Sequence, residues 1–166
     1  KMEIDYSKEV EIIYPFWEIP SFVGNNLIDM VTCPIGIDSK GFFCKVKVRS
    51  SAAKEKLIEV NGFFDTGASR TCISKRVIEI LNPEKNGQSG YTVFEGGYRI
   101  VDKYKVDVFI ENVNSEFQIN ALSAPDNDRG IDVIIGLDII CLGELSITKD
   151  IEGKSVLKFD DPVLPK

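Results

Sequence analysis

A short apolar run that leads directly into Asp-Thr-Gly-Ala-Ser constrains the fold of this chain more than any other feature. Phe63 and Phe64 are typical of the end of a buried strand, which would carry the Asp65 carboxylate out into a turn. Thr66 can hydrogen-bond within that turn, and Gly67 lets another backbone approach because it has no Cβ. The stretch therefore predicts a structured loop that presents one carboxylate.

Two such loops would have a chemistry that one loop lacks. Two carboxylates held about 3 Å apart share one proton, so that one acts as an acid while the other acts as a base. The chain contains a single Asp-Thr-Gly and no Asp-Ser-Gly. The remaining sequence would then have to supply a scaffold, a cover for the site and a surface for dimerisation.

Composition excludes several other kinds of site. The chain has no histidine, which removes Ser-His and Cys-His catalysis and most catalytic zinc sites. A net charge of −6 and the absence of a basic stripe argue against a nucleic-acid partner. No apolar run is long enough to span a bilayer, and the charged start of the chain does not fit a signal peptide, so no membrane segment is expected. No metal or organic cofactor is expected either.

The four cysteines show no closely spaced pair of the metal-binding kind. They are Cys33, Cys44, Cys72 and Cys141. We interpret them as buried free thiols in a reducing cytoplasm. A disulfide between Cys33 and Cys44 across a hairpin remains open.

Short alternating segments from residue 42 onward predict a mainly β protein with one or two short helices. Val46 and Val48 alternate with lysines, which is typical of a half-buried strand. Further strands are expected at 57–64, 71–73, 98–104, 106–110, 117–121 and 131–136, with a closing hairpin at 145–149 and 155–159. Ser74 is a plausible N-cap for a helix ending at Leu81, and a second short helix is expected at 137–142. Residues 84–97 are polar and glycine-rich, and Gly96-Gly97 indicates a hairpin turn. So many short strands favour a closed or nearly closed barrel.

Residues 1–41 differ from the rest of the chain. The segment around Tyr14–Pro20 is aromatic and contains two prolines, which exclude a long helix or a central strand. We predict an extended arm or an additional edge strand, followed by a single domain at 42–160 and a tail at 161–166. The arm could also be a pro-segment that occupies its own or a partner's groove.

Two motifs together resemble the retropepsin-like, or retroviral-type, aspartic protease family. Asp65-Thr-Gly-Ala follows an apolar strand, and Val133-Ile-Ile-Gly136 precedes a short helix in the way that this family's second motif does. The strands after that helix look more like the cellular, bacterial-type branch, and Gly96-Gly97 with the following strand looks like the family's flap. The resemblance covers about residues 42–160.

This resemblance implies a closed acid-protease barrel that forms a homodimer, with one Asp65 from each chain. The implied function is an aspartic endopeptidase whose Asp dyad activates water against an extended peptide. Site roles follow for the matching positions: Asp65 is catalytic, Thr66 and Gly67 form the active-site loop, Ala68, Ser69, Gly96 and Gly97 border the substrate, and Phe64, Ile135 and Gly136 support the site.

The chain departs from the retroviral pattern at two positions. Ser69 and Leu137 stand where retroviral enzymes usually carry an Asp and an Arg that pair with each other. Asp138 is interpreted as a helix-start residue held by backbone N–H groups, and the remaining carboxylates considered, Asp102, Asp107 and Asp132, as strand-edge or loop charges. The alternative function is a catalytically silent domain of the same fold that serves dimerisation or binding of extended peptides.

Overall fold

The computed structural model describes residues 36–38, 41–92, 97–111, 113–124, 129–153 and 155–160. These residues form ten strands and two short helices. The strands are β1 (Gly36–Asp38), β2 (Gly41–Ser50), β3 (Leu57–Phe64), β4 (Cys72–Ser74), β5 (Lys85–Thr92), β6 (Tyr98–Ile110), β7 (Glu116–Ala124), β8 (Val133–Ile135), β9 (Glu144–Lys149) and β10 (Ser155–Asp160), and the helices are α1 (Lys75–Leu81) and α2 (Leu137–Ile140).

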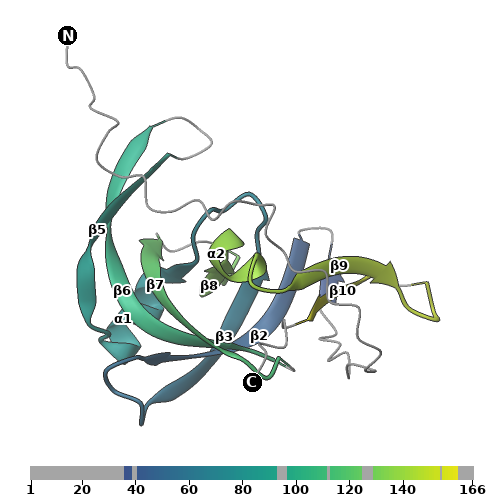
Figure 1. Ribbon diagram of the computed structural model, residues 1–166, viewed down its shortest axis with the longest axis horizontal. Helices are drawn as coiled ribbons and strands as arrows, with labels where there is room; N and C mark the ends of the chain where they lie inside the picture. The colour runs from purple at the N-terminus through teal and green to yellow at the C-terminus, as the bar shows by residue number, and fades with distance from the viewer. Residues whose placement is uncertain are drawn as a thin grey trace, which may run out of the picture.

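Six strands close into a barrel, which confirms the predicted mainly β fold. Their order is β2-β3-β8-β4-β7-β6, and β6 also pairs with β2, so that the sheet returns to its start. β1 and β5 extend the sheet beyond the two closing strands, while β9 and β10 form a separate hairpin. In Figure 1 the β5–β6 hairpin rises on one side of the barrel and the β9–β10 hairpin projects on the other.

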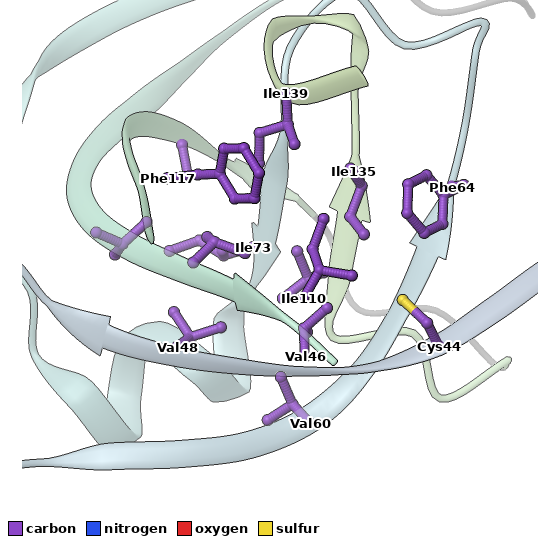
Figure 2. Packing of buried hydrophobic residues seen from close by; sticks show 14 of the residues in the cluster. Cys44, Val46, Val48, Val60, Phe64, Ile73, Ile110, Phe117, Ile135 and Ile139 are labelled. Atoms are coloured by element: carbon purple, nitrogen blue, oxygen red, sulfur yellow. The ribbon is translucent and has the colours of Figure 1, made fainter. Parts of the chain in front are cut away.

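The barrel interior is filled by the apolar face of each strand. In β2, Val46 and Val48 are buried whereas Lys45 and Lys47 are exposed, as the alternation predicts. Figure 2 shows residues from several strands and from α2 meeting in one cluster, among them Phe64, Ile73, Ile110, Phe117, Ile135 and Ile139. Burial of these large side chains is the main source of stability for the scaffold.

Local chemistry sets both ends of α1 as the sequence predicts. The Ser74 hydroxyl accepts a hydrogen bond from the Val77 amide at 3.3 Å. Asn82 follows the helix in the left-handed conformation (φ 44°), and Pro83 then prevents another turn. Because α1 follows β4 directly, the cap also fixes the direction in which the chain leaves the Asp65 loop.

The polar stretch before the hairpin turn forms more regular structure than expected. β5 is a strand of eight residues that pairs with β6, and β6 runs for thirteen residues without a break. The composition of Lys85–Thr92 does not favour a strand, but its pairing with the long β6 overrides that local preference. The hairpin thus stands out from the barrel as a two-stranded arm.

The interpretation of Asp107 as a strand-edge charge is wrong. Its side chain is fully buried and accepts hydrogen bonds from Arg49 Nε at 2.8 Å and Ser51 Oγ at 2.6 Å. Burial raises the pKa of Asp107, but these two donors outweigh it and leave the pKa below its ordinary value. Asp102, by contrast, lies on the β5–β6 hairpin and pairs with Lys85 at 2.7 Å, as expected for a strand-edge charge.

Several predictions concern residues outside the described ranges. These are the aromatic segment 14–20, Cys33, Gly96 and the tail 161–166. Within the segment 1–41, β1 pairs antiparallel with β2 as an edge strand. Cys72 and Cys141 carry free thiols, but the prediction that they are buried is wrong for Cys141, which is exposed. None of the helices in the described ranges has the length and apolar character needed to cross a bilayer.

Candidate active site

The end of β3 places Asp65 at the edge of the barrel. Phe64 is buried and lies beside Ile135 in a parallel pairing of β3 with β8. The next amide, that of Asp65, donates to the Ile135 carbonyl at 3.0 Å. The backbone of Asp65 is therefore held by β8, and its side chain is only partly buried.

Backbone hydrogen bonds then shape the loop. The Gly67 amide donates to Asp65 Oδ1 at 2.9 Å, and the Ala68 amide donates to the Asp65 carbonyl at 3.1 Å. A Cβ at Gly67 would lie 3.1 Å from Asp65 Oδ1, so glycine allows the amide to approach the carboxylate closely. Thr66 and Ser69 are exposed. The loop thus fixes one carboxylate and presents small side chains around it.

Gly136 brings the second motif into contact with the back of this loop. A Cβ at this position would lie 2.5 Å from the Arg70 carbonyl carbon and 2.8 Å from the Thr71 nitrogen. The next amide, that of Leu137, donates to the Ala68 carbonyl at 2.8 Å. The approach needs a residue without a Cβ, because the atoms that such a Cβ would meet belong to the backbone.

Sequence reasoning missed a polar pair behind the loop. Thr71 is fully buried, and its hydroxyl donates to Asp138 Oδ1 at 2.7 Å while accepting from the Gly136 amide at 3.0 Å. The Thr71 amide also donates to Asp138 Oδ1, at 2.8 Å. Asp138 does lie at the start of α2 and does accept a backbone N–H, but the donor comes from the Asp65 loop. The available clue was the Asp138 carboxylate, which stands within an otherwise apolar run.

Asp132 lies in the loop before β8, as interpreted, but its charge does not face solvent. Its carboxylate is buried and bonded to Ser74 Oγ at 3.2 Å and to Arg76 Nη1 at 2.9 and 3.1 Å. Its backbone also bonds to Asn61 and Ser74, since the Asp132 amide donates to the Asn61 carbonyl and the Ser74 amide donates to the Asp132 carbonyl. Asp132 therefore ties the start of α1 to β3 and β8, on which the loop rests.

Cys72 follows the loop directly, and its thiol has an unusually high pKa. Burial, followed by the nearby negative charges of Asp138 and Asp65, raises its pKa to about 11. Its thiol lies 3.6 Å from the Arg70 carbonyl, to which it donates. This thiol stays protonated at neutral pH, so it is a poor nucleophile.

The β5–β6 hairpin carries exposed apolar residues near its tip. Gly97 has a φ of 126°, a conformation that favours glycine, and Gly96 lies outside the described residues. Tyr98 and Ile100 point to the same side of β6, and their exposed fractions are 71% and 65%. The Tyr98 ring covers Gly90 on the paired strand, where a Cβ would collide with it.

Asp65 does not line either of two hollows on the surface of the described residues. One has a volume of about 680 Å³ and lies between α1, the end of β7 and the β5–β6 hairpin. Ala124, near the end of β7, is among the residues that line it. The other, of about 520 Å³, is lined by residues of β2, β3 and β6 and of the turn that follows β6.

The chemical capacity of this site is that of one oriented carboxylate. Among the described residues no cluster of three or more Cys, Asp or Glu side chains could hold a metal ion. Asp65 has a fixed backbone, and the Gly67 amide orients its carboxylate. Acid and base chemistry at this position would need a second carboxylate from another chain.

One family model matches most of the chain. The family described as Cauliflower mosaic virus peptidase (A3) matches residues 40–152. No curated protein sequence matches the chain.

Among solved structures, similar chains include a retropepsin-like aspartic protease from Rickettsia conorii (15% identity, 76% of this chain and 88% of that chain, TM-score 0.48). The retroviral protease-like domain of Ddi1 from Leishmania major has 18% identity over 74% of this chain and 94% of that chain, with a TM-score of 0.40. The foamy viral protease-reverse transcriptase in complex with an RNA/DNA hybrid has 18% identity over 66% of this chain and 13% of that chain, also with a TM-score of 0.40.

Proposed function

Because the chain belongs to the cauliflower mosaic virus peptidase (A3) family, which matches residues 40–152, we propose that it is an aspartic endopeptidase that acts as a homodimer. The observation that carries this proposal is the fixed Asp65 carboxylate at the end of β3, bonded to the Gly67 amide and held by β8 from behind. A loop with exposed Thr66, Gly67 and Ser69 leaves room for the same loop of a second chain.

In the proposed mechanism the two Asp65 carboxylates share one proton. The ionised member takes a proton from a bound water molecule, which attacks the scissile carbonyl carbon, while the protonated member donates a hydrogen bond to the carbonyl oxygen. The proton then passes to the leaving amine. The Gly67 amide donates to Asp65 Oδ1 at 2.9 Å and holds the carboxylate in position. The pair titrates as a unit, and we expect optimal cleavage under mildly acid conditions.

An extended substrate would lie between the Asp65 loop and the β5–β6 hairpin. Ala68 and Ser69 would border it on the loop side, and Gly96, Gly97 and the exposed Tyr98 on the hairpin side. Main-chain hydrogen bonds would supply much of the affinity, and pockets for alternate side chains would supply the preference. The hollow beside α1 offers space for one such side chain.

The free thiols of Cys72 and Cys141 support a reducing compartment, and we place the protein in the cytoplasm. The proposed chemistry needs only the two carboxylates and water. No metal or organic cofactor takes part in it.

The experiment that tests this proposal compares wild type with Asp65→Asn on a mixed peptide library between about pH 4 and 7. Glu55→Gln is the matched control, because it removes an exposed carboxylate from the turn between β2 and β3. We expect cleavage by wild type and by the control, and at least a thousandfold less by Asp65→Asn.

The oligomeric state of each variant is measured by analytical ultracentrifugation in the same buffers. A wild-type protein that is dimeric but does not cleave would favour the silent binding domain over the protease. Cleavage by Asp65→Asn at the wild-type rate would contradict the role of Asp65.

A further inference from the structure

Behind the Asp65 loop, three hydrogen bonds connect Thr71 with Asp138 and with the Gly136 amide. Thr71 Oγ1 donates to Asp138 Oδ1 at 2.7 Å and accepts from the Gly136 amide at 3.0 Å, and the Thr71 amide donates to the same Asp138 oxygen at 2.8 Å. Thr71 has no exposed surface. The acceptor of two of these bonds is a carboxylate oxygen and both distances are short, so these two bonds are of the charge-assisted, strong kind.

This set binds the far end of the loop that begins at Asp65. The near end is held by the bond from the Asp65 amide to the Ile135 carbonyl, and the middle by the bond from the Leu137 amide to the Ala68 carbonyl. All three attachments lead to the same short segment, Ile135–Asp138. The loop is thus hydrogen-bonded at its start, middle and end to one short backbone segment.

We propose that Thr71 and Asp138 are positioning residues, which fasten the loop 65–71 to α2 and thereby set the place of the Asp65 carboxylate. This inference rests on the proposed function for its effect on catalysis. Neither residue needs to touch the substrate. Displacement of a reacting group by about 1 Å can cost about a hundredfold in rate, so an attachment of this kind bears directly on turnover.

The hydroxyl of Thr71 is the part of the pair that a substitution can remove cleanly. Thr71→Val keeps the volume of the side chain but leaves the Gly136 amide without its acceptor and Asp138 without one of its donors. Thr71→Ser keeps the hydroxyl and loses only the methyl group. Thr148→Val in β9 is the matched control, since it makes the same change away from the loop.

The kinetic experiment measures kcat for each variant per active site, titrated with a tight-binding transition-state analogue, so that unfolded protein is not counted. For Thr71→Val we expect kcat to fall at least tenfold with KM within about twofold of wild type. For Thr71→Ser we expect recovery to within about threefold, and for Thr148→Val no change. A kcat for Thr71→Val within twofold of wild type would overturn the proposal, as would a Thr71→Ser variant as slow as Thr71→Val.

A second measurement is independent of catalysis. Hydrogen exchange of the Asp65 and Leu137 amides reports whether the loop is still fastened, with the Val108 amide in β6 as the internal reference. We expect Thr71→Val to speed exchange at the first two amides at least tenfold and to leave the reference unchanged. Equal protection in wild type and variant would refute the positioning role.

The two measurements separate the possible failures. If wild type shows no cleavage that depends on Asp65, the proposed function fails, while exchange still decides whether the pair holds the loop. If Thr71→Val does not fold, Asp138→Asn replaces it, because the amide oxygen still accepts both donors but carries no charge. We expect Asp138→Asn to speed exchange at the Thr71 amide severalfold, and an unchanged rate there would count against the proposal.

Discussion

Substitution of Gly136 by alanine tests whether the second motif needs glycine for its close approach to the Asp65 loop. The backbone at Gly136 is extended (φ −94°, ψ −177°), a conformation that any residue adopts. The new Cβ would lie 2.5 Å from the Arg70 carbonyl carbon, 2.7 Å from its oxygen and 2.8 Å from the Thr71 nitrogen. The expected effect is therefore purely steric.

The magnitude follows from these contacts. Ordinary van der Waals contact begins near 3.4 Å, so the two backbone segments must separate by several tenths of an ångström or more. Overpacking of a core costs about 1–3 kcal/mol, and rigid backbone neighbours favour the upper end. Alanine also lowers the conformational entropy of the unfolded chain, which offsets about 0.4–1 kcal/mol of this loss in stability. We expect a net loss of about 2 kcal/mol in the free energy of unfolding, which lowers Tm by about 4–8 °C.

Urea and thermal denaturation, followed by circular dichroism, measure this loss. Gly153→Ala in the turn between β9 and β10 is the control, because nothing lies within 4 Å of its Cβ and its φ is 77°. That variant should lose only the conformational cost of a left-handed alanine, about 1 kcal/mol. A Gly136→Ala protein as stable as wild type, or no less stable than Gly153→Ala, would refute the steric argument.

Further predictions concern buried and capping groups and the hollow. Asp107→Asn should lose about 2–4 kcal/mol at pH 7, because Arg49 and Ser51 lose a buried anionic acceptor. The folded-state pKa of Asp107 is lowered, so its contribution to stability is present above about pH 4 and is lost as the pH falls further. Urea denaturation between pH 7 and 2 should therefore show that the free energy of unfolding of the variant depends less on pH over that acid range. Parallel curves for variant and wild type would contradict this. Ser74→Ala should lower the free energy of unfolding by about 1–2 kcal/mol, since the α1 cap and the bond to Asp132 both disappear, and a Tm equal to wild type would exclude that role. Cys72, with a pKa of about 11, should be alkylated at pH 8 at least a hundredfold more slowly than the exposed Cys141, as measured by mass spectrometry, and comparable rates would show that burial does not protect it. Ala124→Phe should fill the hollow beside α1 and raise KM several-fold with little change in kcat, and unchanged kinetics would place the substrate elsewhere.

Much of the scaffold could be predicted because it depends on neighbours in sequence. The alternation in β2, the Ser74 cap and the Asn82-Pro83 stop are local features, and each appears in the structure where the pattern indicated it. The close approach at Gly136 was also foreseeable, because a glycine between two apolar runs is typical of a backbone crossing. β5 was not foreseen as a full strand, since its polar sequence gains strand structure only from pairing with β6.

The buried carboxylates show what local patterns do not contain. Asp107 and Asp132 look like surface charges, because the sequence does not reveal that Arg49, Ser51, Ser74 and Arg76 will surround them. A buried charge is tolerated only when its partners are in place, and here most partners lie more than fifty residues away along the chain. Their burial therefore follows from barrel closure.

The chemistry of the candidate site can be read from the residues alone: one Asp in an Asp-Thr-Gly loop at the end of an apolar strand, with no histidine to offer another mechanism. The contacts that hold this loop depend on the folded barrel, because Thr71 and Asp138 are 67 residues apart and meet through the position of β8 between β3 and β4. Residue type and local order are fixed by covalent sequence, whereas a hydrogen bond between distant residues exists only after the packing that brings them together.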